Sequence, residues 1–326
     1  MQPVFKIVAE GGQDATAKIK NRLLSLNITN RSGLNSDILE IRLDDRVPYI
    51  EYPKHGTQLQ AWLGYVDTGL VPFGQYTVDE VMVNGPPDTL TVRAHAINMQ
   101  SKLHSQDTRE WKGKTIGTLV KTIAGKHGLT PAVGTSLSSK TIQHLSQTNE
   151  SDLQLLSRLG KQYDAVAEVA NGKLLFIRRG EASSASGKKL EQILLMPKSL
   201  THWQVTFADR EKAGQTYAYS YDYDKAAVIE KDAQSKIWQD APPQTLKHPV
   251  PEWHIDDTTQ AYQRHQDRCV ETLSIGMPGD PRITAEVSIQ LTGLRPKVDG
   301  KWIVTYVQHT LSAQGYTCQL EAERHM

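Results

Sequence analysis

The chain has 326 residues, of which 38% are hydrophobic and 22% are charged, so it carries enough apolar material for two or three domain cores. Its formal net charge of +1 provides no strong overall field that would draw it to nucleic acid or to an anionic membrane. The N-terminal stretch MQPVFKIVAEGGQDATAKIKNRL has neither a signal-peptide core nor an apolar run of about 18 residues. We therefore expect a chain that is made in a cytoplasm and has no membrane partner.

Residues 1–97 are predicted to form a β domain. Four segments alternate apolar and polar residues, namely SDILEIRLDD, TQLQAWLGYV, YTVDEVMVNG and DTLTVRAHAI, and the stretch NGPPD has turn chemistry. In the first segment Leu39, Ile41 and Leu43 share one side of the strand. Strands that recur about every ten residues with turns between them are typical of a sandwich or a barrel.

The pattern changes to helices and a hairpin in residues 98–189, which are predicted to form a small α+β domain. The stretch GKTIGTLVKTIAGKHGLT begins at Gly113 and places its apolar residues on one helical face. Thr115 is the expected N-cap of this helix, and Gly125 or Gly128 is expected to end it.

A second helix and a tight hairpin are predicted between Asn149 and Gly180. Leucines recur at three- and four-residue steps in the helix, and Asn149 is its expected cap. The strands AVAEVA and KLLFIRR flank Asn171-Gly172, a strong hairpin signal. The polar stretch EASSASGKK at residues 181–189 indicates a linker or a mobile loop.

Strands return in residues 190–326, which are predicted to form a second β domain with an inserted loop and helix at about 241–276. DAPPQTLKHPVPEWH is the Pro-rich loop of this insertion. The helix is expected over residues 256–276, with its N-cap near Asp257 or Thr258.

Four tyrosines, Tyr217, Tyr219, Tyr221 and Tyr223, fall on one face of the predicted strand TYAYSYDYD. Alternating tyrosines can stack on bases or sugars, but the residues between them are not basic, which argues against nucleic acid. More often such rings cover one face of a strand, and a protein–protein interface fits them better than a nucleic acid does.

The two β regions share a pattern of spacing. Gly74-x-Tyr76-x-Val78-x-x-Val81 is echoed by Gly300-x-Trp302-x-Val304-x-x-Val307, and the segments DILEIRL and AEVSIQL stand upstream of the two copies. A repeated β element around a central insertion would be a specific architecture. Coincidence between two generic amphipathic strands is the alternative.

Motifs for phosphate binding and for metal binding are weak. Gly113-Lys114-Thr115 lacks the earlier glycine of a phosphate loop, because Thr108 stands there, so a helix start is preferred. The densest polar group is His254, Asp256 and Asp257, which could ligate a divalent cation, but a loop end that caps the following helix explains the same residues. His265 and Cys269 lie four apart without a second ligand pair, which argues against zinc.

Catalytic patterns are absent as well. There is no G-x-S-x-G, and Asp44, Asp45 and Glu150 are candidate acids by type only, since a turn and a helix start explain them. Cys269 and Cys318 are expected to be buried thiols, with a single disulfide as the alternative. We predict no catalytic, cofactor-binding or metal-binding residue, and no enzyme.

The stretch LQAWLGYVDTGLVPFGQYTVDEVMVNGPPDTLTVRAHA, residues 59–96, resembles the late control protein D family of contractile-tailed phages. The family's W-L-G-Y strand, its G-x-[FY]-x-V-D-E-V strand and its G-P-P-D turn occur here in the same order without gaps. KGKTIGTLVKTIAGKHGL and NESDLQLLSRLGKQYDAVAEV resemble the family's middle region, so the resemblance covers nearly the whole chain.

This resemblance implies a baseplate hub protein, similar to the N-terminal part of type VI secretion spikes. The implied fold is α+β and mainly β, with two β-barrel-like tube domains flanking the small α+β domain. The implied assembly is a homotrimer between the hexameric tail tube and the trimeric central spike, with baseplate wedge and tape-measure proteins as further partners. Its implied place is the tail baseplate of the virion, assembled in the host bacterial cytoplasm, without sequence-specific nucleic-acid binding.

Two other functions stay open at the level of sequence. A peptidoglycan-degrading tail component would need a catalytic domain, for which the chain shows no motif and has no surplus length. A cell-wall-binding module is suggested by a faint similarity of residues 113–130 to lysin-motif domains.

Overall fold

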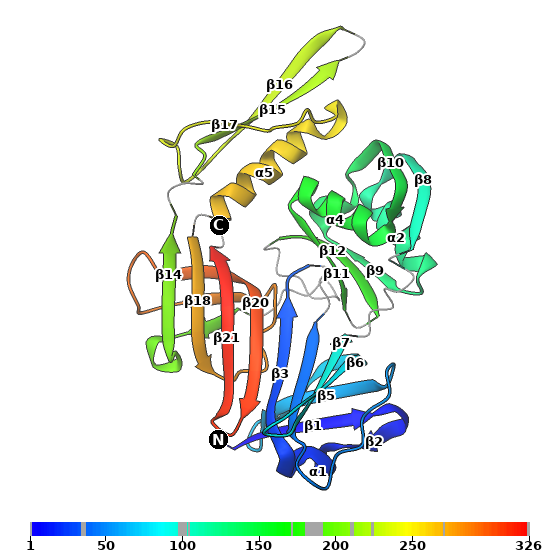
Figure 1. Ribbon diagram of the computed structural model, residues 1–326. Coiled ribbons are helices and arrows are strands. Elements are labelled where there is room, and N and C mark those ends of the chain that lie inside the picture. Colours follow the sequence, from blue (N-terminus) through cyan, green and yellow to red (C-terminus); the bar gives the residue numbers. More distant parts are fainter. Residues whose placement is uncertain are drawn as a thin grey trace.

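The computed structural model describes residues 2–33, 37–96, 103, 105–179 except 171, 192–208, 212–222, 225–269 and 271–324, without the side chains of Ala170 and Cys269. Within them the chain is mainly β. A large sheet fills the lower part of the molecule, a small α+β unit lies beside its upper end, and a hairpin with a helix projects above it (Figure 1). The predicted linker at residues 181–189 lies outside the described residues.

The large sheet has 13 strands in the order β14-β18-β21-β20-β3-β4-β7-β6-β5-β1-β2, with β19 paired to β20 and β13 paired to β19. Its strands are β1 (Pro3–Ala9), β2 (Gln13–Asp14), β3 (Leu23–Arg31), β4 (Ile38–Asp44), β5 (Gln58–Tyr65), β6 (Gly69–Asn84), β7 (Thr89–Ala96), β13 (Ile193–Leu195), β14 (His202–Phe207), β18 (Glu271–Pro278), β19 (Ser288–Leu291), β20 (Gly300–Ser312) and β21 (Gly315–Arg324). A short helix, α1 (Thr16–Ile19), follows β2. The fold is mainly β, as expected. The strands described form no closed barrel, so the two barrel-like tube domains stay a prediction.

The same strand order occurs twice in this sheet. The first half-sheet is β3-β4-β7-β6-β5, and the second is β14-β18-β21-β20-β19. Gly74 opens the repeated motif in β6 with φ 125°, and Gly300 opens it in β20 with φ 134°, a region that favours glycine. A one-residue register shift follows Val78 in β6 and Val304 in β20, at the same place in both motifs. The repeat read from the sequence therefore coincides with a duplicated topology.

The two segments that stand upstream of the motif copies, DILEIRL and AEVSIQL, are not equivalent strands. DILEIRL forms β4, whose counterpart in the second half-sheet is β18, because β4 pairs with β7 as β18 pairs with β21. AEVSIQL instead contributes β19, which pairs with β20 as β5 pairs with β6. Both segments alternate in the same way, so their sequences alone do not distinguish an inner strand from its neighbour.

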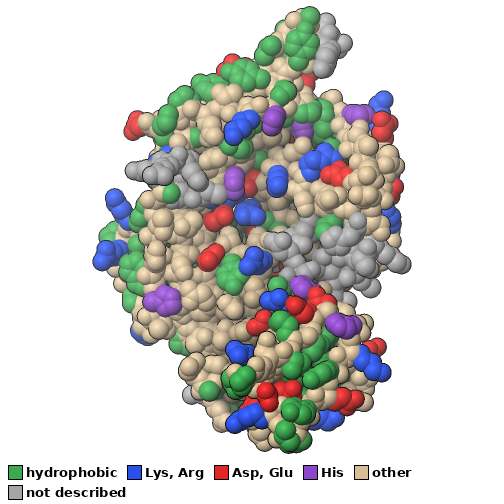
Figure 2. Space-filling view, in the orientation of Figure 1, with side chains coloured by type: hydrophobic (Ala, Val, Ile, Leu, Met, Phe, Trp, Pro, Cys, Tyr) green, Lys and Arg blue, Asp and Glu red, His purple; other side chains and the backbone are tan. Residues whose placement is uncertain are grey.

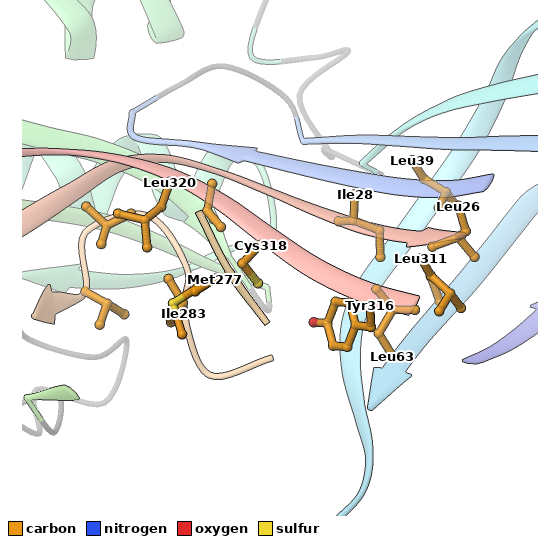
Figure 3. Packing of buried hydrophobic residues seen from close by; sticks show 14 of the residues in the cluster. Leu26, Ile28, Leu39, Leu63, Met277, Ile283, Leu311, Tyr316, Cys318 and Leu320 are labelled. Atoms are coloured by element: carbon orange, nitrogen blue, oxygen red, sulfur yellow. The ribbon is translucent and has the colours of Figure 1, made fainter. Parts of the chain in front are cut away.

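The two half-sheets join directly through β3 and β20. These strands are antiparallel, with Ser25 opposite Ser312 at one end and Arg31 opposite Tyr306 at the other. Leu26 and Ile28 of β3 and Leu311 of β20 all face one apolar core that extends under both halves. Figure 3 shows these residues together with others of that core.

The α+β unit has a core of its own. It comprises β8 (Gln106–Thr115), α2 (Ile116–Lys126), β9 (Thr130–Val133), α3 (Thr135–Ser138), β10 (Thr141–Ser151), α4 (Asp152–Tyr163), β11 (Ala165–Ala170) and β12 (Lys173–Arg178). Thr115 caps α2 as predicted, with its side chain accepting from the Thr118 amide. The helix ends at Lys126, and Gly128 follows with φ 69°. The strands β11 and β12 form the predicted hairpin, with Gly172 in its turn; Asn171 lies outside the described residues.

The cap predicted for α4 was wrong. Strand β10, which the sequence analysis missed, runs through Asn149 and ends at Ser151. Ser151 caps α4 and forms a capping box with Gln154. Asp152 in the first turn is fully buried, and it accepts hydrogen bonds from Arg109 (3.0 Å), Lys126 (3.0 Å) and Gln147 (2.9 Å).

A projecting unit combines α5 (Ile255–Cys269) with a small sheet of β15 (Gln215–Asp222), β16 (Ala227–Gln234) and β17 (Gln244–Thr245). The helix predicted over 256–276 was too long, because residues 271–276 belong to β18. Leu273 and Ile275 are buried there in the core of the sheet, so tertiary pairing overrides the helical pattern. Tyr219 and Tyr221 face outward, 36% and 44% exposed, while Ala218, Ser220 and Asp222, which alternate with them, are buried; Tyr223 lies outside the described residues.

Trp302, the aromatic residue of the second motif copy, provides a stability prediction. Trp302 is fully buried, its indole N–H donates to the Val298 carbonyl at 3.0 Å, and the Arg324 guanidinium lies 4.8 Å from its ring. Replacing Trp302 by alanine should lower the free energy of unfolding by about 3–5 kcal/mol, because it leaves a large cavity. Urea denaturation followed by circular dichroism measures this. Lys301→Ala, at an exposed neighbour, is the control, and a similar loss in both variants would contradict the role given to Trp302.

Candidate assembly surfaces

One face of the large sheet is lined by uncharged polar side chains, and we call it the polar face. Because alternate residues of each strand face the core, those between them point to the opposite side. Over β14, β18, β21, β20 and β3 the polar face comprises Gln204, Thr206, Thr272, Ser274, Thr317, Gln319, Gln308, Thr310, Ser312, Ser25, Asn27 and Thr29. Figure 2 views the molecule from this side, where much of the second half-sheet is tan, as expected for such residues.

Charges on the polar face of the first half-sheet are balanced. Arg93 of β7 lies between two carboxylates, 3.4 Å from Glu40 of β4 and 3.3 Å from Glu80 of β6. At the upper margin the Arg31 guanidinium stacks over the Tyr306 ring at 5.1 Å. The face thus presents hydroxyl and amide groups together with charged groups of both signs, including exposed Arg42 of β4 and Glu321 of β21.

Two open hollows lie at the upper end of this face. One of about 470 Å³ is lined by Arg31, Ser32, Arg179, Thr305, Tyr306 and Glu321. The other, of about 390 Å³, lies over β14, β18 and β21 and includes Gln204, Ser274 and Glu321. Both are polar depressions of the surface, lined by hydroxyl, amide and charged side chains.

On the core side, a group of aromatic and titratable residues fills the seam between the half-sheets, and we call it the seam cluster: Tyr65, Phe73, His309, Tyr316 and Cys318. The Nε2–H of His309 donates to the Ile283 carbonyl at 2.9 Å, which leaves Nδ1 to accept from the Tyr316 hydroxyl at 2.8 Å. Phe73 packs edge-on against His309 at 4.7 Å, and Tyr65 lies 5.5 Å from Tyr316. Residues from both half-sheets therefore meet in one buried group.

The seam cluster contains a thiol and an imidazole at 3.0 Å, a spacing that nucleophilic catalysis also uses. Here burial lowers the pKa of His309 to about 4 and raises the pKa of Cys318 to about 12. At neutral pH both groups are uncharged, whereas a reactive cysteine needs its thiolate. Both side chains are also buried, at 0% and 1% exposure. The arrangement favours packing over catalysis.

A third group, the junction cluster, ties the α+β unit and α5 to the large sheet through Asp164, Arg264, Arg268, Arg179 and Glu323. Arg268 of α5 binds Asp164 through two hydrogen bonds, one of them 2.7 Å, and Arg264 lies 3.3 Å from the same carboxylate. Glu323 of β21 lies 3.7 Å from Arg268 and 3.6 Å from Arg179. The cluster links three parts of the fold that are distant in sequence.

Comparison with known proteins agrees with this architecture. The profile of the phage tail baseplate hub (GPD) family matches residues 62–315. The chain belongs to this family. A probable baseplate hub protein of Escherichia phage 186 is 30% identical, with 99% of this chain and 93% of that protein covered. The family resemblance inferred from the W-L-G-Y and G-P-P-D segments is thereby confirmed.

Solved structures share the fold of this hub-family chain. The 43 kDa tail protein of prophage MuSo2 from Shewanella oneidensis superposes with a TM-score of 0.73 at 14% identity, over 99% of this chain and 98% of that one. A type VI secretion component of Escherichia coli, described as similar to the T4 tail proteins gp27 and gp5, has a TM-score of 0.56 at 13% identity, over 98% and 77% of the two chains.

The metal-ligand candidates of the sequence do not converge. His254 is buried, contacts the Pro251 carbonyl at 3.0 Å and stacks on Trp253. Asp256 and Asp257 turn to different lysines, at 3.5 Å from Lys231 and 2.9 Å from Lys140. Among the described residues no three His, Cys, Asp or Glu side chains are grouped for a metal ion. Both carboxylates lie in the first turn of α5, which agrees with the interpretation of these residues as a helix start.

The three carboxylates considered as catalytic acids each have a hydrogen-bond partner in a turn or a helix. Asp44 pairs with Arg46, and buried Asp45 accepts from the Ile50 amide at 2.7 Å, as in a turn. Glu150 binds Arg158 of α4 at 2.6 Å.

Gly113-Lys114-Thr115 ends β8 and caps α2, so the helix-start interpretation is confirmed. His265 lies on α5, while the side chain of Cys269 lies outside the described atoms, and Cys318 is a buried free thiol. None of the helices described is both long and apolar enough to cross a bilayer.

Three carboxyl groups near the junction cluster provide a pH prediction. Burial raises the pKa of Asp37 to about 6, and burial with the nearby Asp37 and Glu286 raises the pKa of Glu168 to about 7. Burial also raises the pKa of Glu286, whose carboxylate accepts from the Ser32 hydroxyl. An unfolded glutamate ionises near its ordinary value of 4.5. Between that pH and about 7 the folded protein holds a proton that the unfolded chain has lost, so stability falls as the pH rises.

Glu168→Gln mimics the protonated side chain. The variant should therefore melt at a higher temperature than the unsubstituted protein at pH 8 and at nearly the same temperature at pH 5. Calorimetry at the two pH values measures the difference, and Glu110→Gln at an exposed carboxylate of β8 is the control. An equal effect of Glu168→Gln at both pH values would contradict the raised pKa.

Proposed function

We propose that this hub-family chain is a homotrimeric adaptor between the hexameric tail tube and the trimeric central spike of a contractile tail or related injection particle. The observation that carries the proposal is the duplicated half-sheet. Three copies of a chain that contains two equivalent half-sheets present six of them around one axis. A trimer built in this way can offer a nearly six-fold surface to a hexameric tube and a three-fold surface to a spike.

In this proposal the chain divides as the sequence indicates. Residues 1–97 and 190–326 are the two tube domains, each contributing one half-sheet, and the insertion at about 241–276 belongs to the second. Residues 98–189 are the α+β domain, which braces the outside of the ring. The junction cluster supports this role, because it fixes the α+β unit and α5 at one end of the sheet rather than over the polar face.

The polar face would line the central passage of the ring. Its serine, threonine, asparagine and glutamine side chains hold water without offering an apolar anchor. Such a lining would let another polymer pass through the ring without holding it tightly, and we propose no sequence-specific nucleic-acid binding. Tape-measure and baseplate wedge proteins are further proposed partners, and assembly would take place in the host cytoplasm before incorporation into the baseplate.

We infer that the role is structural and not enzymatic. The neutral, buried state of His309 and Cys318 supports this inference. A zymogram on peptidoglycan and a pull-down on insoluble cell wall test the two alternatives. Hydrolysis lost on a single Asp or Glu substitution would establish an enzyme, and retention of the chain on the wall would establish a binding module.

Oligomeric mass tests the adaptor directly. Size-exclusion chromatography with light scattering should give three times the chain mass of 36.4 kDa for the chain alone, and that mass plus the mass of the bound spike when the spike protein is added. Electron microscopy along the axis should then show a ring with six similar lobes. A strictly monomeric chain under all conditions, including the presence of its spike, would overturn the proposed function.

A further inference from the structure

The hairpin of β15 and β16 turns an aromatic and acidic side outward, and we call this side the hairpin face. Side chains alternate along both strands, so the residues that share the outward side stand opposite one another in the antiparallel register. They form three cross-strand pairs: Tyr217 with Asp232, Tyr219 with Glu230, and Tyr221 with Val228. The hairpin face therefore places tyrosine rings directly beside carboxylates.

The hairpin face is open, whereas the other side of the hairpin is covered by α5. On the covered side the Thr216 hydroxyl donates to Gln263 of α5 at 2.7 Å. On the open side Val228 is 65% exposed, in addition to the two exposed tyrosines. The hairpin projects from the rest of the molecule (Figure 1), and hydrophobic side chains lie along its outer margin (Figure 2). Exposed tyrosines on a projecting strand favour contact with another molecule.

The negative charges of the hairpin face are not neutralised by the chain itself. Among the described residues, no lysine or arginine forms an ion pair with Glu230 or Asp232, and Asp232 accepts from a neutral amide at 2.6 Å. The lysines of the hairpin pair elsewhere, since Lys225 binds Asp222 at 3.0 Å and Lys231 lies 3.5 Å from a carboxylate of α5. A cation on the hairpin face would thus have to come from another molecule.

Elsewhere in the fold, an aromatic ring and a carboxylate together hold an arginine. Arg324 lies 4.8 Å from the Trp302 ring, and its Nε is 3.3 Å from Glu271. Arg109 lies 5.4 Å from the Trp111 ring and pairs with a carboxylate at 2.7 Å. A planar guanidinium suits such a site, because it stacks on the ring while its N–H groups bind the acid. The hairpin face provides the ring and the acid of this arrangement.

We propose that the hairpin face binds an arginine-bearing segment of a partner protein, with a guanidinium on a tyrosine ring and its N–H groups on Glu230 or Asp232. The proposal goes beyond the adaptor role and does not depend on it, because the hairpin lies outside both half-sheets. Charge complementarity selects this partner. A nucleic acid would bring phosphates to a negative surface, and a neutral glycan would gain nothing from the two charges.

A labelled peptide tests the chemistry of the partner. Fluorescence anisotropy measures binding of the full chain to a short fluorescein-labelled peptide with arginine at alternate positions and serine between them. A peptide with lysine at the same positions should bind at least about three-fold more weakly, because an ammonium group neither stacks nor binds a carboxylate through two donors. A peptide with glutamine at those positions should not bind.

Variants of the hairpin face locate the site. Glu230→Gln/Asp232→Asn should weaken binding of the arginine peptide at least about ten-fold. Tyr219→Ser should weaken binding of the arginine peptide more than binding of the lysine peptide, because it removes the ring. Asp67→Asn/Glu110→Gln removes the same charge from exposed positions away from the hairpin and should change the affinity by less than about two-fold. Thermal melting of each variant should match that of the unsubstituted chain.

The outcomes either support the arginine site or overturn it. Loss of binding in the hairpin variants alone, with arginine preferred over lysine, supports it. An equal loss in the control variant, or equal binding of the two basic peptides, would reduce the effect to general charge attraction and overturn the proposal. Binding of a chitin oligosaccharide that Tyr219→Ser abolishes, without binding of the arginine peptide, would assign the face to glycans. A changed oligomeric mass of Glu230→Gln/Asp232→Asn would assign it to contacts between copies.

Discussion

The antiparallel ladder between β3 and β20 is the interaction on which the rest of the structure depends. Side chains alternate along a strand with a period of two, so a slip of one residue would place Ile28 opposite Gln308 instead of His309, and the core side of one half-sheet would continue into the polar side of the other. The observed register keeps both half-sheets in phase. One continuous apolar core and one continuous polar face follow from this single pairing.

Buried ionisable groups make the assembly of these parts specific. In the seam cluster, the single acceptor of His309 is matched to the Tyr316 hydroxyl, so the two halves meet in one arrangement of donors and acceptors. In the junction cluster, Asp164 holds Arg268 of α5, and Glu323 of β21 lies close to the same guanidinium. Breaking one partner of such a group leaves a buried charge without compensation, which costs more than the pair contributes.

The duplication also gives the large sheet two halves of equivalent topology. A heterologous contact between unlike edges forms a ring only if its rotation closes. The α+β unit and the hairpin of β15 and β16 lie outside the repeat (Figure 1).

Local sequence determined much of the secondary structure and the family. Thr115 as a cap, the hairpin around Gly172 and the alternation of Leu39, Ile41 and Leu43 depend on neighbours in the chain, so they could be predicted. The paired glycines Gly74 and Gly300 marked the repeat for the same reason, since a positive φ is a local requirement.

Only the tertiary structure decided which strands meet. The pairing of β3 with β20, the extension of β10 to Ser151 and the end of α5 before β18 depend on partners far away in the chain, and amphipathic segments of equal period fit several of them. The polar face and the seam cluster arise from those pairings, because each combines residues that lie more than a hundred positions apart. No pattern within one segment could reveal them.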